Sequence, residues 1–364
     1  MKKVLCLMTA GSGGQDEMRA RRLGSYLDAD ITFVPVDKST SYRASMQRVW
    51  DVLKSDRWDL VYQEGTGITG GINLIRAARA WGQKYIVSSG DPIGGFFHIT
   101  KGPALGLVFE RYERALYQAC SGFVGWTPYL TGAAVGMGAK RATTIEGAVA
   151  LETFLPVDHD ERDRIRAEFG LKNNHLVCGV VGSLNWSRRQ RYCYGLELVE
   201  TIKYLRRNDV SLLIVGDGSG RAELESRVPD KLAGQVVFTG RLPQVDVVRA
   251  MNAMDVGFIT QTLDRLGNFR LTTKLPEYLA CGLPVAMSPI PGYFDYVAPA
   301  GWALPAHHPS SPAFHKACAN WLDRLSWQSI TDKAALARKT AVRHFDYAVL
   351  GRRFRNFVDM VMTD

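Results

Sequence analysis

The sequence has no long apolar run and no clustered cysteines. No stretch approaches the roughly 20 consecutive apolar residues that a membrane-spanning helix needs. The apolar segment 4–8 is too short for a secretory signal and is better explained as a buried strand. No cysteine pair has Cys-x-x-Cys or metal-ligand spacing, and the six cysteines are scattered at positions 6, 120, 178, 193, 281 and 318. These absences exclude a disulfide scaffold and predict a reduced, cytoplasmic protein.

Charge and composition fit a soluble globular protein with a basic surface. Of the 364 residues, 46% are hydrophobic and 22% are charged, and the net charge is +9. The basic residues are dispersed, and no recognisable nucleic-acid-binding module is present. A basic surface attracts phosphates or anionic headgroups, although it is equally explained by solubility alone.

Strand-like and helix-like segments alternate twice along the chain. Segments 4–8, 31–36, 60–62, 85–88 and 122–126 have the character of strands separated by helices, and the pattern restarts at 176–181. Such alternation predicts two doubly wound α/β domains with parallel sheets. The expected ranges are 1–155 for the first domain, 173–325 for the second and 340–364 for a C-terminal helical segment.

Glycine-rich turns follow several of the expected strands. One turn contains Gly13 and Gly14, another begins at Gly182, and a third spans 216–220. Neither a Walker A loop nor a Gly-x-Gly-x-x-Gly fingerprint is present. Because ligands bind outside the carboxyl ends of parallel strands, these turns predict a phosphate-bearing ligand.

The most informative segment is 272–285, with the sequence TTKLPEYLACGLPV. A carboxylate early in a helix, here Glu277, can accept two ribose hydroxyls. Lys274, Thr273 and the helix N-terminus can meet a diphosphate nearby. The alternative is that Glu277 binds no ligand and is only an acidic residue at the start of a helix, where the helix dipole favours it.

This segment resembles the donor-binding motif of family 4 retaining glycosyltransferases, which have the GT-B fold. The segments 180–184, 214–218 and 237–242 are similar to the family's next strand ends, and Gly13-Gly14 is similar to its N-terminal glycine loop. The resemblance implies two Rossmann-like domains that face a central cleft. It also implies metal-independent transfer with retention and a C-terminal helix, 347–362, that crosses back to the first domain.

The resemblance assigns candidate roles residue by residue. Glu277 matches the family's ribose-binding glutamate, whereas Phe269 stands where the first glutamate of the motif would be. Ser183 replaces an arginine, and Arg189, with Arg188 as the alternative, fits the place of a diphosphate-binding lysine. The full donor-binding set is Gly13, Gly14, Gly182, Arg188, Arg241, Leu242, Thr273 and Glu277, and the catalytic candidates are Arg189, Lys274, His98 and Asp91.

The first domain offers fewer candidates for chemistry. Gly90 occupies the place of a histidine that often contacts the transferred sugar in the family. Asp91 follows the fourth strand, and His98 is expected in a glycine-flanked loop. Glu110 and Glu113 are expected on the solvated face of a helix.

Together these features predict a glycosyltransferase that moves a sugar from a nucleotide diphosphate donor to an acceptor hydroxyl. We expect no cofactor and no metal, since the donor is a substrate. The expected role is cell-surface polysaccharide or glycoconjugate biosynthesis, with a saccharide or lipid-linked saccharide as acceptor. Three alternatives stay open: a natural-product glycosyltransferase with a soluble acceptor, a non-catalytic GT-B partner subunit, and a nucleotide-sugar epimerase.

Weak association with the inner face of an anionic membrane is a further expectation. The first 150 residues carry 18 Lys and Arg against 13 Asp and Glu. Two expected helices place arginines beside apolar side chains, and these arginines are Arg19, Arg21, Arg22, Arg43 and Arg48. A soluble enzyme with a soluble acceptor is the alternative.

Overall fold

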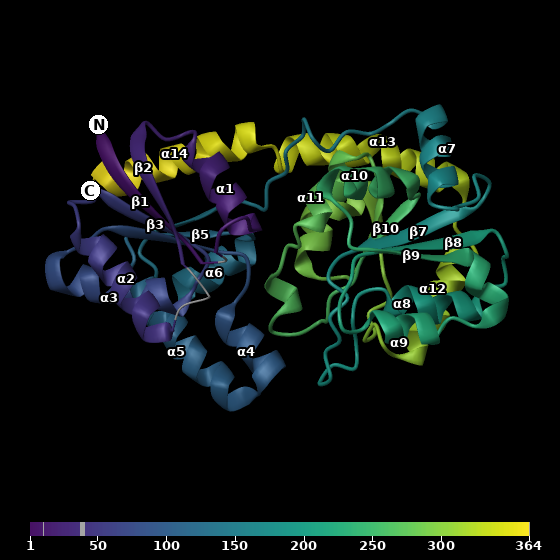
Figure 1. The fold of residues 1–364 in the computed structure, drawn as a ribbon, viewed down its shortest axis with the longest axis horizontal. Helices are drawn as coiled ribbons and strands as arrows, with labels where there is room; N and C mark the ends of the chain where they lie inside the picture. The colour runs from purple at the N-terminus through teal and green to yellow at the C-terminus, as the bar shows by residue number, and fades with distance from the viewer. Residues whose placement is uncertain (10, 37–40, 364) are drawn as a thin grey trace. The chain divides into compact units, whose positions relative to one another are not determined.

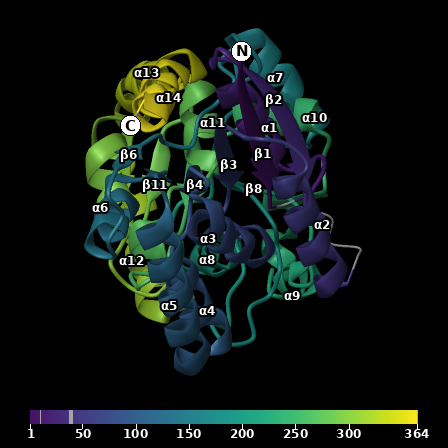
Figure 2. The ribbon, with the colours of Figure 1, turned by 90° about the vertical axis from the view of Figure 1, so that its left-hand side faces the viewer.

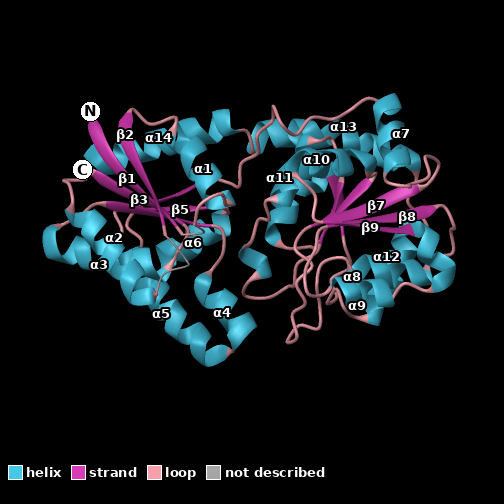
Figure 3. Cartoon of the chain, in the orientation of Figure 1, coloured by secondary structure: helices cyan, strands magenta, loops and turns pink. Residues whose placement is uncertain are grey.

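The computed structural model describes residues 1–9, 11–36 and 41–363, and the chain forms two compact units. Each unit contains one parallel sheet covered by helices (Figure 3). The first unit comprises residues 1–148, 269–271 and 347–364, and the second comprises 149–268 and 272–346.

The first unit is built on a six-stranded sheet with the order β2-β1-β3-β4-β5-β6. Its strands are β1 (Lys2–Met8), β2 (Ala29–Pro35), β3 (Leu60–Glu64), β4 (Tyr85–Ser89), β5 (Gly122–Gly125) and β6 (Ala142–Thr144). Along β1, Val4 and Cys6 enter one core cluster while Leu5 and Leu7 enter the other. Both faces of the strand are therefore buried, which explains its continuous apolar run.

Helices cover both faces of this sheet (Figure 1). The helices are α1 (Gln15–Gly24), α2 (Tyr42–Lys54), α3 (Ile68–Trp81), α4 (Ile93–Lys101), α5 (Pro103–Ala119), α6 (Pro128–Gly136) and α14 (Tyr347–Thr363). Apolar residues of α1 and α14 pack on one face, and those of α2, α3 and α5 pack on the other. The last helix of the chain thus completes the core of the first unit.

The second unit has a six-stranded sheet with the order β12-β11-β10-β7-β8-β9. Its strands are β7 (Leu176–Val181), β8 (Val210–Val215), β9 (Val236–Gly240), β10 (Val256–Ile259), β11 (Val285–Met287) and β12 (Gly301–Ala303). Its α-helices are α7 (His159–Glu168), α8 (Leu196–Thr201), α9 (Arg221–Ser226), α10 (Gln244–Ala253), α11 (Lys274–Ala280), α12 (Pro312–Leu322) and α13 (Trp327–His344). Short 3₁₀ or π turns lie at Ile202–Tyr204, Asp230–Gln235, Gly267–Phe269, Tyr293–Val297 and Ala298–Ala300.

The strand order reverses once in each sheet. In the first sheet the reversal lies between β1 and β3, and in the second it lies between β7 and β10. Ligands of doubly wound sheets bind outside the carboxyl ends of the strands at such reversals.

All six cysteines are buried as free thiols. None of the helices in the described part of the chain has the length and apolar character of a membrane span.

Candidate functional site

Two glycine turns meet at the carboxyl ends of β7 and β8. Gly216 has a φ of +136°, and a Cβ added there would lie 1.9 Å from the carbonyl oxygen of Gly182. The N–H of Leu184 donates to the carbonyl of Asp217 at 3.0 Å, and the N–H of Gly220 donates back to Leu184 at 2.8 Å. Only glycine fits this approach at Gly216, so the turns form one rigid edge.

The floor beside these turns is polar. Tyr194 lies against Gly182, and its hydroxyl accepts a hydrogen bond from the Gln261 amide at 2.8 Å. The buried Glu197 carboxylate accepts hydrogen bonds from Tyr192 at 2.9 Å and Thr260 at 2.8 Å. Sequence reasoning missed this network. A glutamate within the apolar stretch around Leu196 and Leu198 was the available signal.

Helix α11 places Glu277 and Lys274 in contact within the second unit. The Lys274 Nζ lies 2.5 Å from the Glu277 Oε2, and Glu277 is only 7% exposed. Burial raises the pKa of Glu277, and the Lys274 ammonium partly offsets that rise. The Tyr278 hydroxyl accepts the N–H of Val181 at 2.7 Å, which fixes α11 to β7. The site thus holds a buried carboxylate whose partner among the described residues is the Lys274 ammonium.

Residues flanking α11 leave polar groups near this pair. Thr273 is the N-cap residue of α11, but its side chain makes no cap hydrogen bond. The Thr272 Oγ1 is buried and has no hydrogen-bond partner among the described residues. An unpaired buried hydroxyl lowers the stability of the fold, and a hydrogen bond to a bound ligand would remove that cost.

The predicted arginines lie on a hairpin loop. Ser187 and Tyr192 exchange backbone hydrogen bonds of 2.9 and 3.4 Å, and Arg188 and Arg189 in the connecting loop are exposed. Arg188 lines a hollow of about 330 Å³ with Trp186, Ser219 and Glu223. Glu277 is not among the residues that line this hollow. The diphosphate roles of Arg188 and Arg189 therefore stay predictions.

Arg241 and Leu242 follow β9 directly. The N–H of Gly216 donates to the carbonyl of Gly240 at 3.0 Å, so the turn after β9 is tied to the glycine turn after β8. Arg241 is exposed and Leu242 is half-buried. Both residues therefore lie at the same edge of the sheet as Gly182.

The glycine turn of the first unit is held by an internal acid. Gly14 is the N-cap residue of α1, and the N–H of Gly13 donates to the Glu17 Oε2 at 2.8 Å. This hydrogen bond, with one from Arg21, lowers the pKa of Glu17. An anionic ligand at Gly13 would have to displace the Glu17 carboxylate.

Asp91 forms a two-pronged ion pair that the sequence did not indicate. Its carboxylate oxygens lie 2.7 and 3.2 Å from the Nε and Nη2 of Arg270. Phe269, beside Arg270, accepts a hydrogen bond from the Thr127 hydroxyl at 2.9 Å through its carbonyl. Asp91 is thus held by a charged partner that lies far from it in the sequence.

The expectations for His98 and Glu113 need correction. His98 lies in helix α4 rather than in a loop, and its backbone packs against Gly106 of α5. Glu113 is 2% exposed rather than solvated. Its carboxylate accepts the N–H groups of Ile93 at 2.7 Å and Gly94 at 2.9 Å, so it caps the start of α4. Burial raises the pKa of Glu113, and these hydrogen bonds oppose the rise.

The expectation that Arg19 faces a membrane is also wrong, because its side chain is buried. It is 3% exposed and donates to the carbonyls of Ile145 and Glu146, both at 2.7 Å. Its guanidinium lies 4.5 Å from the ring centroid of Trp126, and its Nε lies 3.5 Å from the carboxylate of Glu64. Burial raises the pKa of Glu64, and Arg19 is the main opposing influence.

The other two arginines of α1 are engaged as well. Arg21 pairs with Glu17 at 2.7 Å and lies over the ring of Phe33. Arg22 lies 5.4 Å from the ring centroid of Tyr347. Helix α1 therefore presents fewer free cations than its sequence indicates.

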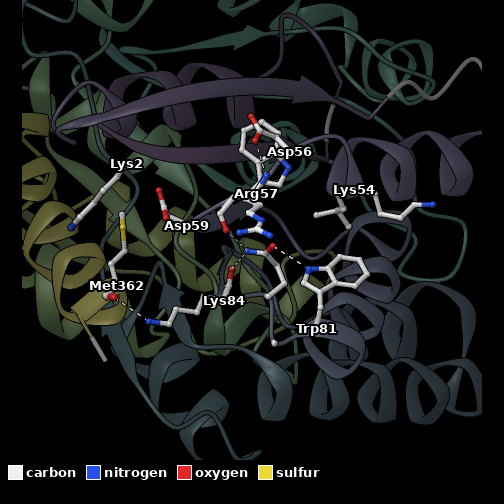
Figure 4. Close-up of a pocket in the computed structure, with 12 residues that line it drawn as sticks. Lys2, Lys54, Asp56, Arg57, Asp59, Trp81, Lys84 and Met362 are labelled. Atoms are coloured by element: carbon white, nitrogen blue, oxygen red, sulfur yellow. Dashed lines mark hydrogen bonds between the residues drawn. The ribbon is translucent and has the colours of Figure 1, made fainter.

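A separate hollow of about 840 Å³ lies at the amino ends of β1, β3 and β4 (Figure 4). Lys2, Lys54, Arg57 and Lys84 line it together with Trp81. No predicted site residue lines this hollow. Within the described ranges, no group of three or more His, Cys, Asp or Glu side chains is placed to hold a metal ion.

Residues 175–324 match the family model described as Glycosyl transferases group 1. A 2-deoxystreptamine glucosyltransferase from Streptomyces kanamyceticus is 31% identical over 139 residues, which are 38% of this chain. That match spans 34% of the relative's length.

Solved structures resemble the whole chain. Anabaena HepE in complex with UDP superposes with a TM-score of 0.75 at 16% identity, covering 99% of this chain and 100% of that one. Sucrose-phosphate synthase from Thermosynechococcus elongatus gives a TM-score of 0.76 at 16% identity, covering 100% of both chains. The chain has the GT-B fold. The fold expected from the sequence and the resemblance to glycosyltransferases are therefore confirmed.

Proposed function

We propose that this GT-B protein transfers a sugar from a nucleoside diphosphate donor to an acceptor hydroxyl. The observation that carries the proposal is the buried Glu277 carboxylate with Lys274 at 2.5 Å, inside the segment that matches group 1 glycosyl transferases. A buried carboxylate is a strong acceptor for paired ribose hydroxyls. When a donor binds, we expect the Lys274 ammonium to turn from Glu277 to the diphosphate.

In the proposed mechanism the chain stabilises charge rather than supplying a nucleophile. As the sugar leaves, negative charge builds on the diphosphate, and Lys274 with Arg188 or Arg189 would stabilise it. The rigid glycine turns at Gly182 and Gly216 would let backbone N–H groups approach the donor. We propose that transfer retains the anomeric configuration and needs neither metal nor cofactor.

Calorimetric titration with UDP, GDP, ADP and dTDP tests donor binding. Replacing Glu277 by Gln should weaken the preferred nucleotide by about 1.5–3 kcal/mol, or roughly 10- to 150-fold. The matched control is Glu200→Gln, which breaks another i,i+3 ion pair with a lysine, Lys203, at 2.9 Å in the same unit. Equal affinity in wild type and Glu277→Gln, or no binding of any nucleotide, would reject the site.

Product analysis separates transfer from the alternatives. Release of nucleoside diphosphate from a nucleotide sugar, with a glycosylated acceptor, supports transfer. Conversion of the donor sugar without an acceptor indicates an epimerase, and binding without turnover indicates a partner subunit.

We propose a saccharide acceptor in cell-surface polysaccharide or glycoconjugate synthesis. A soluble aminocyclitol acceptor is the second candidate, and the similarity to a 2-deoxystreptamine glucosyltransferase favours it. Mass spectrometry after incubation with 2-deoxystreptamine and each nucleotide sugar distinguishes them. A mass increase of one hexose on 2-deoxystreptamine supports the second candidate.

A further inference from the structure

Two hollows on the outside of the first unit meet at a pair of tryptophans. The hollow of about 840 Å³ at the amino ends of β1, β3 and β4 is lined by Trp81 and Lys54, among others (Figure 4). A second hollow of about 400 Å³ lies beside α2 and is lined by Trp50 and by the same Lys54. The ring centroids of Trp50 and Trp81 are 5.1 Å apart. The two hollows therefore join into one depression, termed here the tryptophan groove.

The tryptophan groove is long enough for an extended chain. Helices α2 and α3 pack side by side (Figures 1 and 2), and the Asn73 Nδ2 of α3 donates to the Met46 carbonyl of α2 at 2.8 Å. The lining residues on α2 extend from Tyr42 to Lys54, a length of about 18 Å at a rise of 1.5 Å per residue. A groove of this length exceeds a single sugar ring.

Positive charge lines the tryptophan groove in both hollows. The lining cations are Lys2, Lys54, Arg57, Lys84, Arg43 and Arg76. The acids among the described lining residues are Asp56 and Asp59. Lys3, which does not line the groove, holds both of them, because its Nζ lies 2.5 Å from the Asp56 Oδ2 and its N–H donates to the Asp59 Oδ2 at 2.7 Å. The groove therefore attracts anions.

Arg57 is well placed to bind an acidic group. Its side chain is exposed and makes no hydrogen bond or ion pair with any residue that the structure describes. By contrast, the Lys84 ammonium donates to the Met362 carbonyl at 3.0 Å, and the Arg76 guanidinium lies 4.2 Å from the ring centroid of Trp50. A guanidinium can hold a carboxylate or sulfate with two parallel hydrogen bonds.

Trp81 supplies an apolar wall beside these cations. Its indole N–H donates to the Gln83 Oε1 at 3.4 Å, and the Gln83 Nε2 donates to the Trp58 carbonyl at 3.0 Å. The indole is thus held in place, although 44% of the residue's surface stays exposed. Because one face of a sugar ring consists of C–H groups, it can pack on such an indole.

We propose that the tryptophan groove binds an extended anionic saccharide. Arg57 and Lys54 bind acidic groups of the chain, and a sugar ring packs on Trp81. The preference for a saccharide over a nucleic acid rests on the function proposed above. Strand β1 is seven residues long, so the larger hollow lies roughly 20 Å from the carboxyl ends of the strands. The groove is therefore a second site, which holds a part of the acceptor chain remote from the reacting hydroxyl.

Calorimetric titration of the full chain with an oligogalacturonate tests the proposal. This acidic oligosaccharide should bind at low salt, and its affinity should fall as the salt concentration rises. A maltooligosaccharide of equal length should bind more weakly, because it carries no charge. Galacturonate should also bind more weakly, because a single ring cannot contact both Arg57 and Trp81.

Two variants and two matched controls locate the binding. Arg57→Gln should lose about three- to fivefold in oligogalacturonate affinity, as expected for one exposed ionic contact. Trp81→Ala should lose at least about fivefold, because it removes the apolar wall. The controls are Arg352→Gln, which removes an exposed cation from α14, and Trp327→Ala, which removes a 47% exposed indole from α13. Neither control residue lines the groove, so both variants should keep wild-type affinity.

Thermal unfolding shows whether each variant folds, and nucleotide affinity is measured separately. A chain that binds nucleotides but no oligogalacturonate refutes the groove and leaves the donor site intact. A chain that binds oligogalacturonate but no nucleotide refutes the donor site instead. Wild-type affinity in both Arg57→Gln and Trp81→Ala, or an equal loss in the controls, overturns the proposal. Tighter binding of a single-stranded oligonucleotide, weakened by the same two variants, also overturns it.

Discussion

Replacing Arg19 by Ala should destabilise the first unit far more than its position on an amphipathic helix indicates. Arg19 makes two hydrogen bonds of 2.7 Å to the carbonyls of Ile145 and Glu146 and lies 3.5 Å from Glu64. Removing one partner of a buried ion pair costs about 3–5 kcal/mol, because the other charge stays buried. The control is Arg21→Ala on the same helix, whose ion pair with Glu17 lies at the surface and should contribute little to stability.

The loss of stability caused by Arg19→Ala should increase with pH. Burial raises the pKa of Glu64 above its unfolded value of 4.5, and Arg19 restrains the rise. A carboxyl with a raised pKa binds more protons in the folded state, so stability falls as the pH rises above about 4.5. Without Arg19 that fall is steeper and extends to higher pH. The difference between wild type and Arg19→Ala should therefore grow from pH 5 to pH 8.

Urea unfolding at both pH values measures this difference, with hydrogen exchange of the β1 and β3 amides assigning it to the first unit. The double variant Arg19→Ala/Glu64→Gln should recover part of the loss, because it removes the uncompensated carboxylate. A loss below 1 kcal/mol, or one that does not change with pH, would refute the reasoning.

Three further changes test other features. Gly216→Ala should lower the free energy of unfolding, measured by thermal unfolding, by more than about 3 kcal/mol, because the added Cβ would meet the Gly182 carbonyl. Gly13→Ala should lower it by only roughly 1 kcal/mol, because Gly13 has a φ of +78° but open space around the added Cβ. Glu113→Gln should speed hydrogen exchange at the start of α4 by weakening two N–H hydrogen bonds, with a loss of about 1–3 kcal/mol; unchanged exchange would reject its capping role. Nucleotide affinity should increase with pH as Glu277, whose pKa is raised, ionises; a profile unaltered by Glu277→Gln would contradict this.

The sheets were predictable because their strands are short, apolar and separated by helical patterns. Segment 176–181 is buried along its whole length, so nearly every residue in it carries the apolar signal. Helix α4 was missed because Gly94 and Gly95 weaken its pattern. Gly94 is instead needed for packing, since its backbone lies against Glu110.

Candidate residues close together in the sequence were easier to predict than distant pairs. Lys274 and Glu277 are three residues apart on one helix, so their contact follows from helical geometry. Asp91 and Arg270 are 179 residues apart, and no local pattern connects them. We expected Glu113 to be solvated because charged side chains usually are. It is buried because its carboxylate accepts the first N–H groups of α4, and the sequence did not reveal where that helix begins.

The six buried thiols give this protein a built-in reporter of how its two units open. Burial raises the pKa of Cys120, Cys193, Cys281 and Cys318 to about 12, so alkylating reagents at neutral pH should react with these thiols only after local or global opening. Cys6 and Cys120 lie in the first unit and the other four in the second. Timed alkylation followed by peptide mass spectrometry would therefore report the opening rate of each unit separately, without any introduced label.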